Sequence, residues 1–279
     1  MLTKKHARVL KRQISRLYGR SYIPVINPNN VLSIGDILIK KRDVVPIINS
    51  SAFDPSKVKF EEGRKLNTNI TSNTGVNVTI KLKGTSILSE HFKANEAGLV
   101  VNFSGSNQMF LKVMGLRQQS IRNFLPLRNE LLTKYTIAEL SPKIYIVRGL
   151  VYADKFYLQY SSTNGGSIAF NLDAKSNVSA TSVDSDFSLK WIKEVGYNID
   201  GLNGGVLAYR VSGLRLNRHL MPTSIHRDIL NGNSEEDILD MISLKERKKL
   251  FEKNALEIVD LTDELALYNL NTEENTVLS

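Results

Sequence analysis

The most regular pattern in the chain is an alternation of apolar and polar residues. From residue 76 to residue 83 every second residue is aliphatic, with Asn, Thr or Lys between, which is the period of a strand with one buried face. Similar short runs, rich in β-branched and aromatic residues, recur as far as residue 211. The Gly165-Gly166 pair between two of these runs has the chemistry of a hairpin turn. The pattern therefore predicts a twisted, mainly antiparallel central sheet.

Helical periodicity is limited to three regions. Residues 3–18 combine basic residues with apolar residues spaced by about 3.6 and end near Gly19. Residues 120–140 are the best candidate within the body, although Pro126 interrupts them. Ser234 begins the third region as an N-cap, Ser243 and Glu246 form a capping box, and residues 256–270 also have helical periodicity. We expect an α+β protein with flanking helices and a short helical C-terminal segment that docks on the body.

A linker around residues 231–233 separates two parts of opposite charge. Residues 235–279 hold 12 acidic and 5 basic side chains, a net charge of −7 within a total of +9, which leaves +16 on residues 1–234. We assign residues 1–233 to the main domain and residues 234–279 to an acidic segment. A basic body attracts nucleic acid or an anionic membrane face, and an acidic tail in the same chain can mask it. The plain alternative is that two solvated faces differ in charge.

The composition is typical of a folded protein that is not exported. With 279 residues and 42% apolar residues, the chain is long enough for one main core. There is neither a long apolar run nor a signal peptide, so we expect a cytoplasmic protein. Because the chain has no Cys, it has no disulfides, no Cys-ligated zinc and no thiol chemistry.

The basic excess is densest in the N-terminal helix, ahead of the first acidic residue, Asp36. Clustered Lys and Arg on an amphipathic helix suit an anionic membrane surface. The other interpretation is a capping helix whose apolar stripe packs on the body, and both can hold for the same helix in two states. The candidate lipid-binding residues are Lys4, Lys5, Arg8, Lys11, Arg12 and Arg16.

Three long stretches without charge are candidates for strands that enter a membrane. They cover residues 66–80, 97–111 and 156–172, and a tilted strand crosses a bilayer with about 9–11 residues. An ordinary sheet and loop surface rich in Asn, Ser and Thr explains the same composition. The candidate membrane-inserting residues are Val78, Ile80, Val101, Phe103, Phe156, Leu158, Phe170, Leu172, Leu189 and Tyr209.

No catalytic or cofactor-binding motif stands out. Walker, GxGxxG, GxSxG and HExxH sequences are missing, and the spacing of His219 and His226 matches no standard metal pattern. We therefore expect a protein that is not an enzyme and that uses no cofactor or metal; an enzyme with dispersed residues stays open. The main alternative is a basic, β-rich nucleic-acid-binding protein with an acidic masking tail, although no RRM, KH or helix-turn-helix signature is present.

The order of the motifs in the first 42 residues is distinctive. The basic helix is followed by Tyr22-Ile23-Pro24-Val25, and then by Gly35-Asp36-Ile37-Leu38 ahead of Lys40-Lys41-Arg42. This order resembles the opening of the gasdermin pore-forming domain. Residues 144–150 and 204–214 are similar to the long membrane-inserting hairpin of that domain and to its closing strand. The resemblance covers residues 3–217 and is to the bacterial members, which have this length.

The resemblance implies an autoinhibited pore former. Gasdermins are soluble until a partner protease, often caspase-like in bacteria, removes a C-terminal inhibitory segment. They then oligomerise, insert two β-hairpins per subunit and cause cell death, which in bacteria serves antiphage defence. The implied partners are anionic lipids, the protease and further copies, with no nucleic acid. The implied protein is a monomer while inhibited and moves from the cytoplasm to the inner cell membrane. Bacterial members often carry a palmitoylated N-terminal Cys, which this chain lacks, so attachment here depends on the basic helix.

On this interpretation the tail carries both the inhibitory lock and the cleavage region. The apolar side of the lock is expected at Val259, Leu261, Leu265, Leu267 and Leu270. The cleavage region is expected at Lys249, Phe251, Lys253 and Asn254, with residues 231–234 as a second candidate. A charge on the lipid face of a strand, such as Phe170→Asp, is expected to block insertion without stopping expression.

Overall fold

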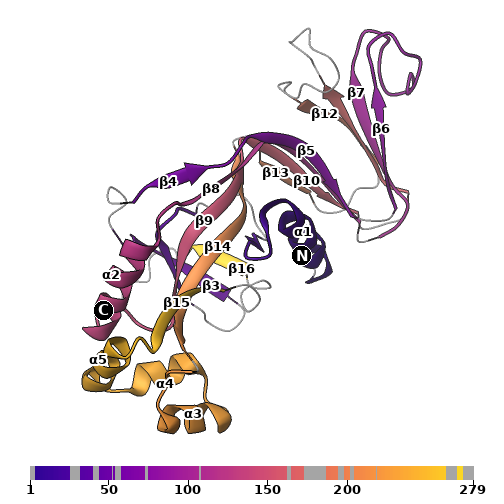
Figure 1. Cartoon of the computed structure of the whole chain (residues 1–279). Helices are drawn as coiled ribbons and strands as arrows, with labels where there is room; N and C mark the ends of the chain where they lie inside the picture. The colour runs from indigo at the N-terminus through magenta and orange to yellow at the C-terminus, as the bar shows by residue number, and fades with distance from the viewer. Residues whose placement is uncertain are drawn as a thin grey trace. The chain divides into compact units, whose positions relative to one another are not determined.

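The structure is a computed structural model (Figure 1). It describes residues 4–25, 32–39, 44–51, 53, 58–72, 75–106, 108–161, 165–172, 187–193, 198–201, 204–217, 219–261 and 269–272. Helices α1 to α5 and strands β1 to β16 in these residues confirm the α+β class with a large, mainly antiparallel sheet. Within the described ranges, no helix is both long enough and apolar enough to cross a membrane.

The chain forms two compact units, each assembled from separate stretches of sequence. Unit 1 contains residues 1–13, 64–117 and 152–205, and unit 2 contains residues 14–63, 118–151 and 206–279. The predicted boundary near residue 233 separates a main domain from an inhibitory segment and is not a boundary between these two units. It stays a prediction.

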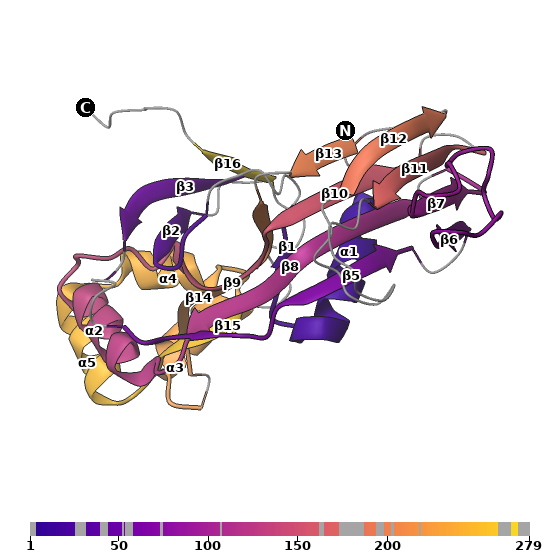
Figure 2. The ribbon, with the colours of Figure 1, turned by 90° about the horizontal axis from the view of Figure 1, so that it is seen from above.

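Unit 1 is built from two long β-hairpins that lie side by side (Figure 2). In each hairpin both arms consist of two strands separated by a corner. The first hairpin comprises β5 (Leu66–Thr71), β6 (Val76–Lys81), β7 (Gly98–Phe103) and β8 (Met109–Ile121), with β5 paired to β8 and β6 to β7. The second comprises β10 (Lys155–Tyr160), β11 (Ser167–Leu172), β12 (Phe187–Lys193) and β13 (Asn198–Gly201), with β10 paired to β13 and β11 to β12.

The register between the two hairpins is the same on both sides of the corner. Met109 lies opposite Tyr160 on one side, and Asn102 lies opposite Ser167 on the other. The corner takes the same number of residues from each of these strands, so pairing resumes without a slip that would exchange the two faces. Beyond the corner, β12, β11, β7 and β6 form a four-stranded sheet in that order.

Unit 2 is a mixed sheet with helices packed on it. In the order β14, β9, β2, β3 and β16, each strand pairs with the next, and β14 also pairs with β1 and β15. The bounds are β1 (Ile23–Pro24), β2 (Asp36–Ile39), β3 (Val44–Ser51), β4 (Phe60–Glu62), β9 (Ile144–Ala153), β14 (Gly205–Leu216), β15 (Leu256–Leu261) and β16 (Asn269–Thr272). Strand β4 pairs with the last residues of β8.

The helices confirm the first two helical regions with changed bounds and the third up to residue 252, while α3 was not predicted. They are α1 (Lys4–Tyr18), α2 (Leu125–Thr136), α3 (Thr223–Leu230), α4 (Glu235–Met241) and α5 (Leu244–Glu252). Helix α2 is shorter than the expected range of 120–140, because residues 120 and 121 complete strand β8 and Pro126 lies in the first turn of the helix.

The expectation of a helix over residues 256–270 is wrong. Residues 256–261 form β15, which pairs with β14, and residues 269–272 form β16, which pairs with β3 in parallel. The sequence LEIVDL fits an alternating pattern as well as a helical one, and the neighbouring strand β14 provides backbone partners that a short isolated helix would lack.

Candidate functional site

The four-stranded sheet of unit 1 has one apolar face and one face of small and polar residues. Residues directly opposite in antiparallel strands share a face, so Val78 lies beside Val101 and Ile80 beside Leu99. On the next strand, Ile168 and Phe170 continue the same apolar face. The residues assigned to the other face are mainly small or polar, with Val100 and Trp191 as the exceptions: Asn77, Thr79, Lys81, Gly98, Val100, Asn102, Ser167, Ala169, Asn171, Ser188, Trp191 and Lys193.

The apolar face is covered by unit 1 itself along most of its width. Leu99, Val101 and Phe170 belong to one core cluster with Phe110 and Tyr157. The Phe170 ring lies 5.7 Å from that of Phe110 and 5.0 Å from that of Tyr157, centroid to centroid. These contacts bury Phe170 completely. A charge at Phe170 is therefore expected to stop folding, which corrects the expectation that expression would be unaffected.

The edge strand β6 extends its apolar side chains into solvent. Val78 is 36% exposed and Ile80 is 50% exposed, while Leu82 just beyond the strand is 48% exposed. On the opposite side of the same strand, Lys81 is fully buried. The strand is thus inverted with respect to the usual rule for a soluble protein, since its aliphatic residues meet water and its lysine does not.

The polar face is covered by the connection between β6 and β7. Phe92 from this connection packs on Val100 and Ala169, and its ring fills the space where a Cβ on Gly98 would lie. The Lys81 ammonium donates to the carbonyl oxygen of Glu96 at 2.8 Å and to that of Ala94 at 3.3 Å. This role of Lys81 was not predicted, because nothing in the alternation of β6 distinguishes Lys81 from the solvated Lys83.

The corners between the paired strands are held by neutral polar groups. Ser161 donates through Oγ to Gly105 O at 2.8 Å and through its amide to Gln108 O at 2.9 Å. Ser104 donates to Gly75 O, and a Cβ on Gly75, which has φ +81°, would meet the Gln108 side chain. None of these bonds involves an ionised group, so the corners add no charge to the uncharged stretches of the hairpins.

In unit 2 the tail segment packs against α2 and β14 in one buried apolar cluster. Leu239 of α4, Leu250 of α5 and Leu256 of β15 share one buried cluster with Tyr135 of α2 and Leu214 of β14. The Tyr135 hydroxyl donates to Leu239 O at 2.8 Å, and burial raises its pKa. The prediction that the tail docks on the body is confirmed for residues 234–261.

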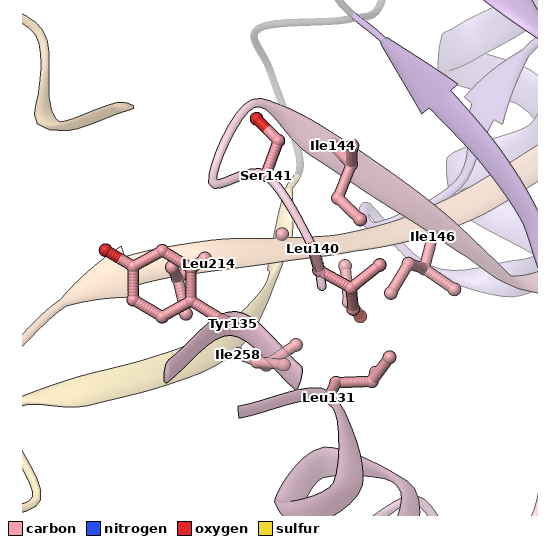
Figure 3. Close-up of a pocket in the computed structure, with 10 residues that line it drawn as sticks. Leu131, Tyr135, Leu140, Ser141, Ile144, Ile146, Leu214 and Ile258 are labelled. Carbon is pink, nitrogen blue, oxygen red and sulfur yellow. The ribbon is translucent and has the colours of Figure 1, made fainter. Parts of the chain in front are cut away.

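A small cavity lies where the tail strand meets α2 (Figure 3). It offers about 20 Å³ of free space, enough for about one water molecule. The labelled residues that line it are Leu131, Tyr135, Leu140, Ser141, Ile144, Ile146, Leu214 and Ile258. Because the lining is mainly aliphatic, the cavity marks the apolar seam under β15 rather than a polar binding site.

Ion pairs fix the tail at two further places. Lys143 lies 3.1 Å from both Asp237 and Asp240, and these bonds, that of Asp240 first, raise the pKa of the lysine. Arg215 Nη1 lies 2.6 Å from Glu236 Oε1. The Ser234 hydroxyl, followed by Lys143, lowers the pKa of Asp237. The acidic first turn of α4 is thus paired with basic residues of the body.

The strongest polar anchor of the tail strand is Asp260. Its carboxylate lies 3.2 Å from Arg148 Nη1 on β9 and 3.1 Å from Arg210 Nε on β14, and it accepts from Ser212 Oγ at 2.9 Å. The side chains of Arg148, Arg210 and Asp260 are only 16%, 20% and 28% exposed. Sequence reasoning missed this cluster because its members are far apart in the chain and only strand pairing brings them together.

The predicted lipid-binding residues lie on a helix whose apolar stripe is buried. Leu10 and Ile14 are at most 2% exposed, whereas Arg8, Arg12 and Arg16 are exposed and spaced by four. Lys11 is half-buried, and the side chains of Lys4 and Lys5 lie outside the description. The packed stripe is what the capping interpretation requires, and the exposed arginine row is what lipid binding requires.

The predicted membrane-inserting residues fall into three groups. Seven of them belong to the apolar face of the four-stranded sheet: Val78, Ile80, Val101, Phe103, Phe170, Leu172 and Leu189, the register partner of Phe170. Phe156 and Leu158 are fully buried in β10. Tyr209 is in unit 2, where it pairs with Ile23, so the structure does not bring it together with the others.

The predicted tail residues are only partly described. Val259 is half-buried on β15, Leu261 and Leu270 are described by backbone pairing alone, and Leu265 and Leu267 lie outside the described residues. In the predicted cleavage region, Lys249 and Phe251 lie within α5, whereas Lys253 and Asn254 form the turn before β15. Asn254 has φ +54°, and the Ala255 amide donates to Leu250 O, which closes a Schellman motif.

Comparisons with known proteins give a distant structural similarity. No family model matches the chain, and no curated protein matches it. Among solved structures, the chain is similar to a bacterial gasdermin from Bradyrhizobium tropiciagri, with a TM-score of 0.35 and 10% identity over 94% of this chain and 95% of that one. A similarity at this level carries no functional argument, so we base the functional proposal on the chain's own residues.

Within the described part of the chain, no group of three or more His, Cys, Asp or Glu side chains is placed to hold a metal. A groove of about 490 Å³ is lined by Glu235, Glu236, Glu257 and Arg215, and three of these four side chains already bond to one another or to Asn217.

Proposed function

We propose that the chain is an autoinhibited pore-forming protein of the gasdermin type. The observation that carries the proposal is the four-stranded sheet of unit 1, formed by two hairpins in register and divided into one apolar and one polar face. A sheet that crosses a membrane needs an apolar face toward lipid, a polar face toward water and full backbone pairing between strands.

The route from the folded sheet to an inserted one follows from the corners. The register between β8 and β10 continues between β7 and β11, so straightening the corners of these inner strands would keep their pairing. The outer strands would have to shift, because Val76 follows Thr71 by five positions whereas Phe110 follows Phe103, the partner of Val76, by seven. The described bonds of Ser104 and Ser161 at the corners join neutral groups, and residues 66–80, 97–111 and 156–172 contain no ionised group to desolvate. The overhanging Val78 and Ile80 would gain lipid contacts in place of water.

The tail would act as the inhibitor by completing unit 2. Strand β15 covers the edge of β14, Asp260 neutralises part of the charge of two arginines, and α4 and α5 share the core with α2. Cleavage in the exposed turn at Lys253 and Asn254 would cut the chain just before β15. Strand β15 would then stay on β14 only through non-covalent contacts. Release of β15, engagement of anionic lipid by α1, oligomerisation at the inner membrane and cell death in antiphage defence complete the proposal.

The test is dye release from anionic vesicles. The full chain is compared with a chain cut at a protease site engineered into the turn at residues 253–254. We expect leakage only after cleavage. A cut chain that is folded and soluble but releases no dye would contradict the proposal and would move the basic body to nucleic-acid binding assays.

A pair of variants ties leakage to the two-faced sheet. Ile80→Asp places a charge on the apolar face at a position that is already half exposed, so the soluble protein should fold, whereas insertion should cost up to about 2 kcal/mol per subunit. Asn77→Asp is the matched control, since it adds the same charge at an exposed position of the polar face of the same strand. Equal leakage by the two variants would show that these faces do not direct insertion.

A further inference from the structure

Two arginines and a hydroxyl from separate strands converge on one point of unit 2. Arg148 of β9 and Arg210 of β14 approach different oxygens of the Asp260 carboxylate, and Ser212 donates to the oxygen that faces Arg148. The Arg148 guanidinium is also fixed from another side, since it lies 4.3 Å from the centroid of the Phe124 ring. Arg148 is therefore held in place by the fold and not by Asp260 alone.

A buried hydroxyl adds to the same group. Tyr22 is 1% exposed, and burial raises its pKa to about 12 against the opposing effect of the nearby Arg210 charge. Its hydroxyl lies against Gly149, the neighbour of Arg148, where a Cβ would come within 2.8 Å of it. Because residue 149 is a glycine and has no side chain, the Tyr22 phenol can lie close to β9, the strand that carries Arg148.

The charges at this point do not balance. Two guanidinium groups carry two positive charges, and among the described ion pairs Asp260 is their shared carboxylate, with one negative charge. Without β15 the arginines would keep two positive charges on side chains that are about four-fifths buried, which is costly unless an anion takes the place of Asp260. Arginine forks and hydroxyls are the usual donors to phosphate oxygens, and a phosphate dianion matches both the charge and the number of donors.

We infer that Arg148, Arg210 and Ser212 form a phosphate-binding site that Asp260 occupies as an internal ligand while the tail strand is in place. The inference rests on the proposed function only in that the tail is released during activation. A phosphate group and Asp260 then compete for the same donors. A ligand that binds only the released form favours release by mass action, so phosphate would shift the equilibrium of β15 away from β14.

The first experiment measures binding of inorganic phosphate to the full chain by titration calorimetry in a chloride buffer. Asp260→Ala opens the site without cutting the chain, and it should bind phosphate at least about tenfold more tightly than the wild type. Adding Arg210→Gln to that variant should remove about tenfold or more of the gain, because one charged donor is lost. Equal phosphate affinity of the wild type and Asp260→Ala would overturn the inference.

The controls separate this site from general effects of charge and folding. Glu257→Gln also removes a carboxylate from β15, but that carboxylate bonds to Asn217 and not to an arginine, so phosphate affinity should stay at the wild-type value. A gain of the same size with Glu257→Gln would overturn the inference in favour of non-specific attraction. If Asp260→Ala does not fold, Asp260→Asn keeps the shape and one oxygen while it removes the charge, and the same comparison applies.

A second arm identifies the source of the phosphate. Co-sedimentation of Asp260→Ala with phosphatidylcholine vesicles containing phosphatidic acid, lost on adding Arg148→Gln, would assign the site to a lipid headgroup. Phosphate binding with no gain in vesicle binding would assign it to a soluble phosphate compound. Both results support the site, and neither requires a pore. Failure of the cut chain to release dye would therefore contradict the proposed function and leave this inference in place.

Discussion

The hairpin sheet of unit 1 and the tail interface of unit 2 both bury large apolar residues, but they use different polar groups. The corners of the hairpins are closed by Ser, Gln and backbone groups, all neutral. The tail is held by ion pairs between its own carboxylates and two arginines and a lysine of the body. Hydrogen bonds between neutral groups can be replaced by others when a segment moves to a new environment. A buried charge, by contrast, becomes costly once the group that pairs with it has left. The difference separates a region suited to refolding from a region suited to release.

The largest expected effect comes from placing a charge inside the hairpin sheet. Phe170→Asp puts a carboxylate among Phe110, Tyr157 and Leu99, and we expect a loss of about 4 kcal/mol or more of folding free energy. Soluble expression and urea unfolding measure the loss. A soluble variant with unchanged unfolding would show that the apolar face is not packed as described.

A large effect is also expected in the tail core. Leu239→Ala removes a fully buried side chain of α4, at a cost of about 2–5 kcal/mol. Because Leu239 packs on α2 and β14, the loss should appear as faster hydrogen exchange in α4 and α5, with unit 1 unchanged. Met241→Ala is the matched control, since Met241 is 81% exposed on the same helix. Equal exchange in the two variants would contradict the docked arrangement.

A moderate effect is expected where the hairpins begin. Gly115 has φ +64°, and a Cβ there would lie 2.2 Å from Oδ2 of Asp154, which pairs with Lys65 and Arg117. Gly115→Ala should therefore cost about 1–3 kcal/mol in unfolding experiments. Gly84→Ala isolates the backbone part of this cost, because Gly84 has φ +81° with nothing within 4 Å of its Cβ position. If Gly115→Ala and Gly84→Ala lower the free energy of unfolding equally, contact with Asp154 adds nothing to the cost at residue 115.

A smaller effect is expected at the capping box of α5. Ser243 Oγ accepts from the Glu246 amide and donates to the Glu246 carboxylate, which also accepts from the Ser243 amide. The two bonds to the carboxylate, that of the hydroxyl first, lower the pKa of Glu246. Ser243→Ala should cost about 1 kcal/mol and loosen α5, as measured by hydrogen exchange. Ser224→Ala, at an exposed position in α3 whose N-cap is Pro222, should change little. Similar losses in both would argue against the box.

The smallest effect, and the most direct test of the contrast, is that of salt. Raising the concentration of sodium chloride to about 1 M shortens the screening length to about 3 Å and weakens exposed ion pairs, each worth at most about 1 kcal/mol. Hydrogen exchange in α4, held by the exposed pairs of Lys143 with Asp237 and Asp240, should become faster, while exchange in β7 and β11 should not. Faster exchange in all of these elements would remove the distinction between the two regions.

The hairpin strands could be predicted from sequence because their cause is local. The strict alternation from Val76 to Leu82 specifies a strand with two different faces wherever it lies, and the Ser, Asn and Gly residues between runs specify turns. The capped helices α4 and α5 were predicted for the same reason, since Ser234 and Ser243 bond within three residues of themselves. The tail from residue 256 was not predictable in this way, because its six residues fit either period.

The sequence by itself determined the β-rich α+β class, the two-faced strands, the helix caps and the contrast between a basic body and an acidic tail. Only the tertiary structure decided that β15 is a strand, that Lys81 is buried while Ile80 is exposed, and that Arg148, Arg210 and Asp260 meet. Period and capping act over a few residues, so they can be read along the chain. Strand partners and ion pairs depend on which distant segments fold side by side, and no local pattern contains that information.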